Sequence, residues 1–316
     1  MSAIDVVGVT KSYGKNKVIN NLSFSVEKGE NFGLLGPNGT GKSTLINMMT
    51  GTLFPDEGEV VVLGKETKHK IEDIRNEIAL VPQTISLYES LTVYENLDFF
   101  GNLYLKGQVK TKVEEILHAL HLGKKRSSLV SILSGGYQRL TSIACALMAE
   151  PEILFLDEPL AGIDIYTHNL IVDFLKSKED MTIIFTTHSV HEAEMVCDRI
   201  LFLGPGKKLL EGKPEEIINQ YSRLFGEKII IEFDSLVNVG KVRSYFENAG
   251  FNIKDPLTRD NTFSFTCMDL GKTVVEVMSV LHVCQEHVVN IDIKKISLED
   301  ILKYVVLENE KTTGNN

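Results

Sequence analysis

The residues of this chain best suited to chemistry form a glycine-rich loop. The segment Gly36-Pro-Asn-Gly-Thr-Gly-Lys42-Ser43 fits the pattern G-x-x-x-x-G-K-S, between an apolar run and a predicted helix. Glycines let successive backbone N–H groups turn toward phosphate oxygens, and the helix N-terminus adds partial positive charge. We expect Lys42 to reach the β- and γ-phosphates of a nucleotide, and the Ser43 hydroxyl to ligate Mg²⁺. The residues expected to bind the nucleotide here are Gly36, Pro37, Asn38, Gly39, Thr40, Gly41, Lys42, Ser43 and Thr44.

Two adjacent acids end a second apolar run. Asp157 and Glu158 follow residues 153–156, which are all apolar. At the carboxyl end of a buried strand, Asp157 is placed to hold hydrated Mg²⁺, and Glu158 is a candidate general base for an attacking water. Paired acids at a strand end are common in α/β proteins, so this interpretation depends on the glycine loop in the same chain.

A second anion site is predicted at Ser134-Gly135-Gly136, which opens a predicted helix over residues 135–148. Such a helix start offers free backbone amides and a hydroxyl. Two anion sites in one chain indicate either two phosphates or two chains that share one nucleotide. The alternative is an ordinary helix cap without a ligand.

The elements that must position these residues alternate between strand and helix, which predicts an α/β fold. Short, continuous apolar runs are typical of a parallel sheet that is buried on both faces. Strands are predicted at residues 4–10, 23–27, 31–35, 59–63, 78–81, 153–156 and 182–186. Helices are predicted at residues 43–50, 91–104, 111–122 and 135–148.

A break near residues 222–227 separates a second unit, and the predicted domains are 1–222 and 223–308. The second unit has the order β-α-β-β-α-β, which predicts a small α+β domain of the ferredoxin-like type. One of its helical faces begins at Val237. Ser297 is expected to cap the last helix, with Asp300 at the capping-box position. Residues 309–316 are polar and are expected to form a disordered tail.

Composition bounds the class of protein. The chain has 316 residues, of which 43% are hydrophobic and 24% charged, as in globular proteins. Its formal net charge of −10 argues against broad nucleic-acid binding, which needs a basic face. No apolar stretch is long enough to span a bilayer, so direct membrane insertion is not expected and a membrane role requires a partner.

The segment Leu133-Ser-Gly-Gly-Tyr-Gln138 stands between the glycine loop and the Asp157–Glu158 pair. With these motifs in this order, residues 4–222 resemble the ATP-binding subunit of ABC transporters. The resemblance implies a P-loop NTPase core with an ABC-type helical subdomain, and ATP with Mg²⁺ as cofactors. It also implies a head-to-tail dimer, in which Ser134, Gly135, Gly136 and Gln138 of one copy face the γ-phosphate held by the loop of the other.

The resemblance assigns further residues. Tyr13 is similar to the aromatic residue that stacks on adenine, and His188 to the histidine that contacts the γ-phosphate. Gln83 is similar to the glutamine that touches Mg²⁺ and the attacking water. Asp164 is similar to the acid of the loop that crosses to the other subunit. With Lys42, Gln83, Glu158 and His188 all present as catalytic residues, hydrolysis and not only binding is expected.

The segments 87–96 and 296–301 resemble the subgroup of multidrug, sodium and carbohydrate exporters. That subgroup implies a separate transmembrane permease subunit, with Tyr88 and Glu89 as candidate contacts, and a cytoplasmic location on the inner face of the cell membrane. A homodimer is expected, but a heterodimer stays open. So do the cargo and the role of the C-terminal unit, as a regulator site or a buttress of the dimer.

Two other functions remain as alternatives. A soluble ABC ATPase acting on ribosomes or nucleic acid usually carries two ATPase halves or a long coiled coil, whereas this chain has one half and no coiled coil. A phosphate-loop kinase or GTPase offers no role for the helix that begins after Ser134.

Overall fold

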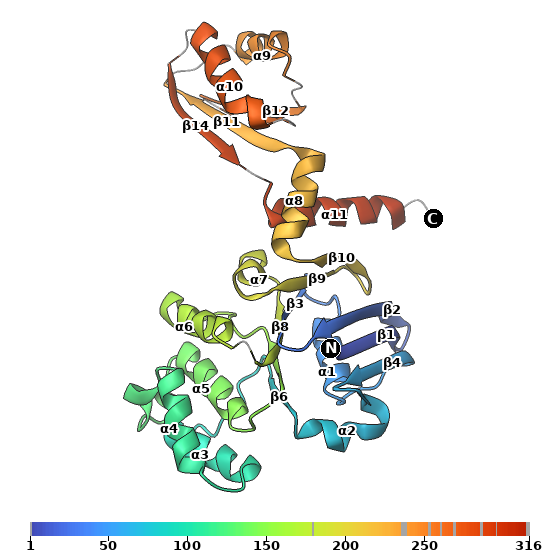
Figure 1. The fold of residues 1–316 in the computed structure, drawn as a ribbon, viewed down its shortest axis with the longest axis vertical. Helices are drawn as coiled ribbons and strands as arrows, with labels where there is room; N and C mark the ends of the chain where they lie inside the picture. The colour runs from blue at the N-terminus through green and yellow to red at the C-terminus, as the bar shows by residue number, and fades with distance from the viewer. Residues whose placement is uncertain are drawn as a thin grey trace. The chain divides into compact units, whose positions relative to one another are not determined.

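The computed structural model describes residues 2–178, 180–234, 239–251, 254–259, 261–267, 270–284, 287–294 and 296–313. The chain divides into two compact units, Met1–Gly212 and Lys213–Asn316. Their elements are drawn in Figure 1. The division falls before helix α8 (Pro214–Phe225), ten residues earlier than the predicted end at 222. The reason is packing, because the Phe225 ring lies 4.5 Å from the ring of Tyr304 in α11 (Leu298–Thr313) of the second unit.

A six-stranded sheet forms the centre of the first unit, in the order β10-β9-β3-β8-β7-β6. The five strands from β9 to β6 are parallel, and β10 pairs antiparallel at the edge. Every residue of β3 and β8 is buried, which confirms the expected sheet with two covered faces. The strands are β3 (Asn31–Leu35), β6 (Ile78–Val81), β7 (Ile153–Asp157), β8 (Thr182–Thr187), β9 (Arg199–Leu203) and β10 (Lys208–Gly212).

A second, antiparallel sheet has the order β2-β1-β4-β5. Its strands are β1 (Ser2–Tyr13), β2 (Asn16–Glu27), β4 (Glu57–Val62) and β5 (Lys65–Glu66). The first two are longer than the predicted strands at residues 4–10 and 23–27. Asn21 takes a φ of 49° where the β1–β2 register shifts. One buried cluster joins both sheets to helix α1 (Lys42–Met49).

Three helices of the first unit pack on one another, as Figure 1 shows, and the last of them also packs against β6: α3 (Val93–Tyr104), α4 (Val109–Ala119) and α5 (Gly135–Leu147). Thr92 and Glu95 form a capping box that starts α3. The prediction missed α2 (Thr67–Arg75), α6 (Ile165–Lys176) and α7 (Val190–Val196). In the described residues, no helix combines the length and apolarity needed to cross a bilayer.

The second unit contains a four-stranded antiparallel sheet in the order β12-β13-β11-β14. Its elements follow the expected β-α-β-β-α-β order, although Val237 lies outside the described residues. Between α8 and α11 come β11 (Glu227–Phe233), α9 (Val239–Asn248), β12 (Lys254–Arg259), β13 (Thr262–Cys267), α10 (Leu270–Cys284) and β14 (Val288–Lys294).

The last helix, α11, begins as predicted. The Asp300 amide donates to the Ser297 hydroxyl at 3.1 Å, and that hydroxyl donates to the Asp300 carboxylate at 2.6 Å. The predicted disordered tail from residue 309 was wrong for its first five residues, because α11 continues to Thr313. The other three residues of that prediction lie outside the described residues.

Candidate nucleotide-binding site

The glycine-rich loop connects the end of β3 to the start of α1. The Gly36 amide donates to the Thr187 carbonyl at 3.3 Å, which ties the loop to the neighbouring strand β8. Gly41, just before α1, has a φ of 104°, and the Ile19 side chain occupies the space that a Cβ would need. Both constraints require glycine at this position. The contact also brings the β1–β2 hairpin against the loop.

The Lys42 side chain is only 6% exposed. Its ammonium group donates to the carbonyls of Gly36 at 2.7 Å and Pro37 at 3.1 Å. Burial lowers the pKa of Lys42, and the carboxylates of Glu158 and Asp157 oppose part of that effect. An anionic phosphate is a stronger acceptor than a neutral carbonyl, so a bound nucleotide can replace the two loop carbonyls as partners of this lysine.

Glu158 is the centre of the site. Its carboxylate accepts a hydrogen bond from Gln83 Nε2 at 3.0 Å, and it lies 3.8 Å from Lys42 Nζ and 3.6 Å from His188 Nδ1. The carboxyl ends of parallel strands meet at one edge of a sheet. The four residues follow β3, β6, β7 and β8, so the structure brings together all four predicted catalytic side chains.

Thr186, in β8, fixes the two acids relative to each other. Its hydroxyl is fully buried, donates to Asp157 Oδ1 at 2.7 Å and accepts from the Glu158 amide at 2.8 Å. Glu158 has a φ of 46°, a left-handed conformation that costs a non-glycine residue free energy. Sequence reasoning missed Thr186. A threonine in a fully buried strand was the available signal, because a buried hydroxyl needs a partner.

The oxygen donors predicted for the metal suit Mg²⁺, which prefers carboxylate and other hard oxygen ligands. Ser43 and Gln83 are exposed, and Asp157 is half-buried at the end of β7. The other predicted loop contacts are divided: Pro37, Asn38 and Gly39 are exposed, Thr44 is half-buried, and the buried Thr40 hydroxyl donates to the Pro37 carbonyl at 2.9 Å.

Arg139, in α5, is a second residue that sequence reasoning missed. Its side chain is buried and donates to the carbonyls of Pro82 at 2.5 Å and Gln83 at 2.6 Å. Burial lowers the pKa of Arg139, and the nearby carboxylate of Asp157 opposes this effect. The helix that begins after Ser134 is therefore bonded to the chain segment that carries Gln83.

Ser134 and Gly135 are exposed at the start of α5, whereas Gly136 is buried. Ser134 is the N-cap residue, but its hydroxyl caps no backbone amide. A Cβ on Gly136 would lie 2.8 Å from Thr167 Oγ1, so glycine permits the close packing of α5 on α6. The Gln138 side chain donates to the Val130 carbonyl at 3.0 Å, which uses its amide group to hold the preceding loop. Among the described residues, no hydrogen bond or ion pair joins this segment to the glycine-rich loop.

Two further predicted residues lie at the ends of elements. Tyr13 ends β1 and is 51% exposed. Asp164 caps α6 and accepts from the Thr167 amide at 3.0 Å and the Thr167 hydroxyl at 2.9 Å. These hydrogen bonds lower the pKa of Asp164.

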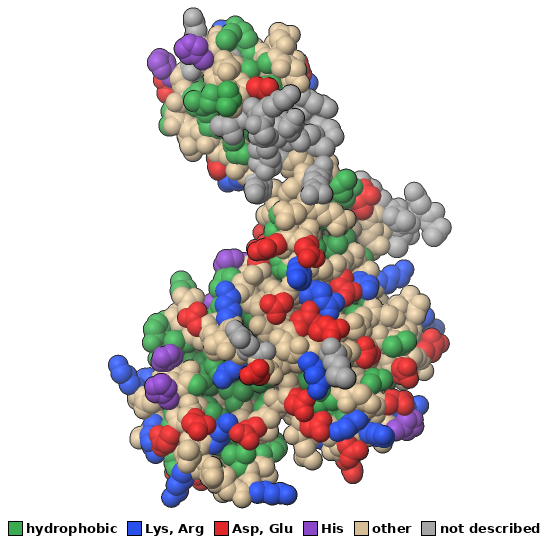
Figure 2. Space-filling model, viewed as in Figure 1, with side chains coloured by type: hydrophobic (Ala, Val, Ile, Leu, Met, Phe, Trp, Pro, Cys, Tyr) green, Lys and Arg blue, Asp and Glu red, His purple; other side chains and the backbone are tan. Residues whose placement is uncertain are grey.

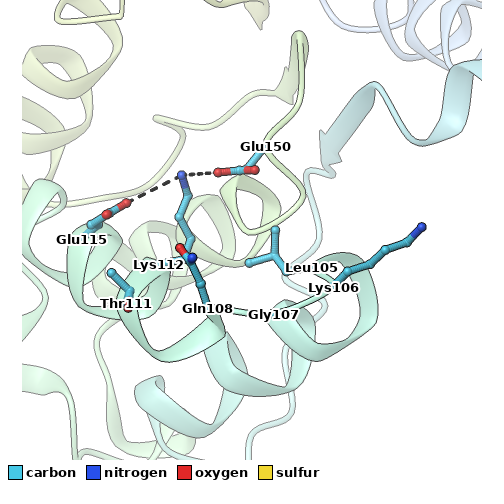
Figure 3. A pocket seen from close by; sticks show the side chains of 8 residues that line it. All are labelled: Leu105, Lys106, Gly107, Gln108, Thr111, Lys112, Glu115 and Glu150. Atoms are coloured by element: carbon cyan, nitrogen blue, oxygen red, sulfur yellow. Dashed lines mark ion pairs between the residues drawn. The ribbon is translucent and has the colours of Figure 1, made fainter.

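A hollow of about 360 Å³ lies beside the α3–α4 connection and α4, and Figure 3 shows its lining side chains. Residues 105–108, Thr111, Lys112, Glu115 and Glu150 line it. Lys112 is paired with Glu150 at 2.6 Å and with Glu115 at 3.8 Å. None of the predicted nucleotide contacts lines this hollow.

Comparisons with known proteins agree with this geometry. A family profile described as "ABC transporter" matches residues 19–161. Nod factor export ATP-binding protein I of Bradyrhizobium diazoefficiens is 41% identical over 223 residues, which are 69% of this chain and 73% of that protein. This chain belongs to the ABC transporter family of ATP-binding proteins. A second member, the linearmycin resistance ATP-binding protein LnrL of Bacillus subtilis, is 39% identical and matches 70% of this chain and 72% of that protein.

Solved structures match the same ABC cassette fold. One is a dimeric ATP-binding cassette in a post-hydrolysis state bound to ADP and Pi, with a TM-score of 0.61 and 28% identity over 66% of this chain and 98% of that one. Another, cbiO1 of Clostridium perfringens, has a TM-score of 0.63 and 27% identity over 70% of this chain and 94% of that one. The predicted family and the cassette fold are confirmed, and this ABC protein is an ATPase that uses ATP with Mg²⁺.

Proposed function

We propose that this ABC protein is the ATP-hydrolysing subunit of an exporter. Two copies close head to tail around two ATP molecules and drive a separate transmembrane permease. The main support for hydrolysis is the Glu158 carboxylate, which lies close to the side chains of Lys42, Gln83 and His188. The relatives named for Nod factor export and linearmycin resistance support an export role.

In this proposal the chain's own residues divide the chemistry. Lys42 and backbone amides of residues 38–44 would hold the β- and γ-phosphates, while Ser43, Gln83 and Asp157 would hold Mg²⁺. The metal neutralises charge on the phosphate oxygens. Glu158 takes the proton from the water that attacks the γ-phosphorus, as the bond to the oxygen bridging the β- and γ-phosphates breaks. His188 contacts the γ-phosphate, and Tyr13 stacks on adenine.

The exposed start of α5 supports a site shared between two copies. Free amides at Ser134, Gly135 and Gly136 suit the γ-phosphate held by the loop of the other copy. Apolar side chains beside this segment and beside Asp164 are exposed: Ile132 is 74% exposed, Ile165 82% and Tyr166 62%. Burial of these side chains would stabilise a dimer. Intact motifs permit a homodimer, with two equal sites.

An exposed aromatic patch formed by Tyr88 and helix α3 is suited to contact with the permease. Tyr88 is 49% exposed, and its ring lies 4.8 Å from that of Phe99 in α3, with exposed Leu103 and Tyr104 on the same helix. Exposed apolar patches of this kind mark protein contacts. Contact with the permease through this patch, with Glu89 beside it, would hold the subunit at the inner face of the cell membrane without inserting it.

Action on nucleic acid is the weaker alternative. Figure 2 shows acidic and basic side chains intermixed on one face of the described residues, and the net charge is −10. A nucleic-acid site requires clustered basic residues.

The assignment of Glu158 is tested with Glu158→Gln. This variant should bind ATP normally, lose turnover by about 100-fold or more, and accumulate as an ATP-loaded dimer in light scattering. Glu152→Gln makes the same change in an exposed glutamate that pairs with Lys28, and it should behave as the unmodified protein does. Normal hydrolysis by Glu158→Gln would refute Glu158 as the base.

A further inference from the structure

We propose that Arg139 is a positioning residue that places Gln83 against Glu158, so that the hydrolytic site forms only when helix α5 is in place. The inference deepens the proposed function, because it assumes that Glu158 and Gln83 act in hydrolysis. It adds a residue outside the nucleotide contacts to the machinery for that reaction.

The contact between Arg139 and the segment that carries Gln83 has a fixed geometry. Arg139 donates to two successive carbonyls, Pro82 at 2.5 Å and Gln83 at 2.6 Å. The planar guanidinium group presents donors in a fixed fork, whereas a lysine ammonium is a point charge without that geometry. A fork bonded to adjacent carbonyls fixes both the position and the direction of the backbone that carries Gln83.

The backbone of Gln83 carries a side chain that reaches the proposed general base. The side chain of the same Gln83 donates to Glu158 Oε2 at 3.0 Å. Gln83 itself is exposed, so packing around its side chain does little to hold it. Its reach toward Glu158 therefore depends on where its backbone is held, and the buried Arg139 supplies that hold.

Arg139 belongs to the same helix that begins after Ser134. Residues 139–145 are all buried, and Gly136 packs tightly on Thr167 of α6. Ser134 and Arg139 lie within the first two turns of one packed helix, which moves as a unit. A displacement of Ser134 by a nucleotide or a second copy would move Arg139, and with it Gln83.

The experiment compares Arg139→Lys with Arg126→Lys. The control arginine pairs with Glu114 at 2.6 Å and stacks on Tyr94 at 4.4 Å, away from Gln83. Arg139→Lys should lower kcat roughly 10- to 100-fold, because small misplacements of catalytic groups have effects of that size. Its Kd for ATP should stay within about twofold of the original value, since no nucleotide contact is changed. A kcat for Arg139→Lys equal to that of Arg126→Lys overturns the inference.

A double variant tests whether Arg139 acts through Gln83. If it does, Arg139→Lys combined with Gln83→Ala should be no slower than Gln83→Ala alone. Multiplied losses would show an independent, general effect and overturn the inference. If Glu158→Gln abolishes turnover while Arg139→Lys has no effect, the proposed function stands and this inference alone fails.

Hydrogen exchange keeps the inference testable if Arg139→Lys does not fold. In Glu158→Gln protein, added ATP should change the protection of amides 83–86 and of the first turns of α5 together. A change confined to one of the two segments would overturn the coupling.

Discussion

Two regions are expected to contact phosphate, the glycine-rich loop and the start of α5. They differ in how many of their polar groups have hydrogen-bond partners within the chain. In the loop, Lys42 is buried and bonded to two carbonyls, and Gly36 is bonded to Thr187. At the start of α5, Ser134 is exposed and its hydroxyl caps no backbone amide. The loop is built within one chain, whereas in the proposed dimer a second copy would complete the second region.

In the proposed dimer, this difference gives each of the two predicted anion sites its own role. A self-contained site binds nucleotide in a single copy, and an incomplete one makes catalysis depend on assembly. ATP closes a dimer only if it binds the closed form more tightly than the open form. A γ-phosphate held by both regions supplies that difference in affinity.

The largest effect should come from the self-contained region. Lys42→Met removes the ammonium group, which donates to two loop carbonyls and is expected to donate to phosphate when nucleotide binds. Hydrogen bonds to charged groups contribute about 1.5–3 kcal/mol, so Kd for ATP should rise roughly 10- to 100-fold. Turnover should fall below detection. Lys65→Met, which breaks the half-buried pair with Glu77 far from the loop in sequence, is the matched control for titration with a fluorescent nucleotide. Unchanged affinity in Lys42→Met would contradict the loop as the phosphate site.

Ser134→Arg should separate binding from hydrolysis. Its bulk and charge obstruct the exposed start of α5 but leave the loop intact, so Kd for ATP should change little. Loss of donors to the γ-phosphate should lower kcat by roughly 100-fold or more. Ser279→Arg makes the same substitution at an exposed serine in α10 and should leave both constants unchanged.

A mixture of two defective proteins gives a sharper test. In a head-to-tail dimer of Lys42→Met with Ser134→Arg, one site combines both defects and the other combines two intact halves. Mixing should therefore restore part of the ATPase activity that neither variant has alone. A mixture as inactive as its components would favour two independent sites in each chain over a shared one.

Much of the site was predictable because its motifs lie at the ends of short, continuous apolar strands. Strand β6 was predicted over residues 78–81 and has those bounds, and β7 and β8 extend one residue beyond their predicted ends. Parallel pairing then places Gln83, Glu158 and His188 at one edge of the sheet without further information. Spacing and hydrophobicity were sufficient for this part.

Arg139 shows where such prediction ends. An arginine in a helix is usually exposed, and its partners here are backbone carbonyls 57 and 56 residues earlier, which every sequence possesses. Gln138 shows the reverse case. Its place in the motif predicts a nucleotide contact, but in the described structure its amide donates to Val130. Residue type and spacing do not determine which way a side chain turns.

The smallest expected effect comes from Thr186, whose hydrogen bonds hold Asp157 and Glu158 beside the glycine-rich loop. Thr186→Val deletes the hydroxyl that accepts from the Glu158 amide and donates to Asp157. Leaving two partners unsatisfied should cost about 1–3 kcal/mol of unfolding free energy. It should also lower kcat by about tenfold, because Glu158 loses part of what holds its left-handed backbone.

Thr186→Ser restores the hydroxyl and distinguishes the network from simple packing. It should recover most of the activity lost in Thr186→Val, measured as kcat at saturating ATP beside thermal unfolding of both variants. Because Thr186 is fully buried, the missing methyl group of serine leaves a small cavity, with a cost of about 1 kcal/mol. The Thr186→Ser variant should therefore be less stable than the unmodified protein yet nearly as active. If Thr186→Val is as active as Thr186→Ser, the hydroxyl does not position Glu158, and other contacts must hold its backbone.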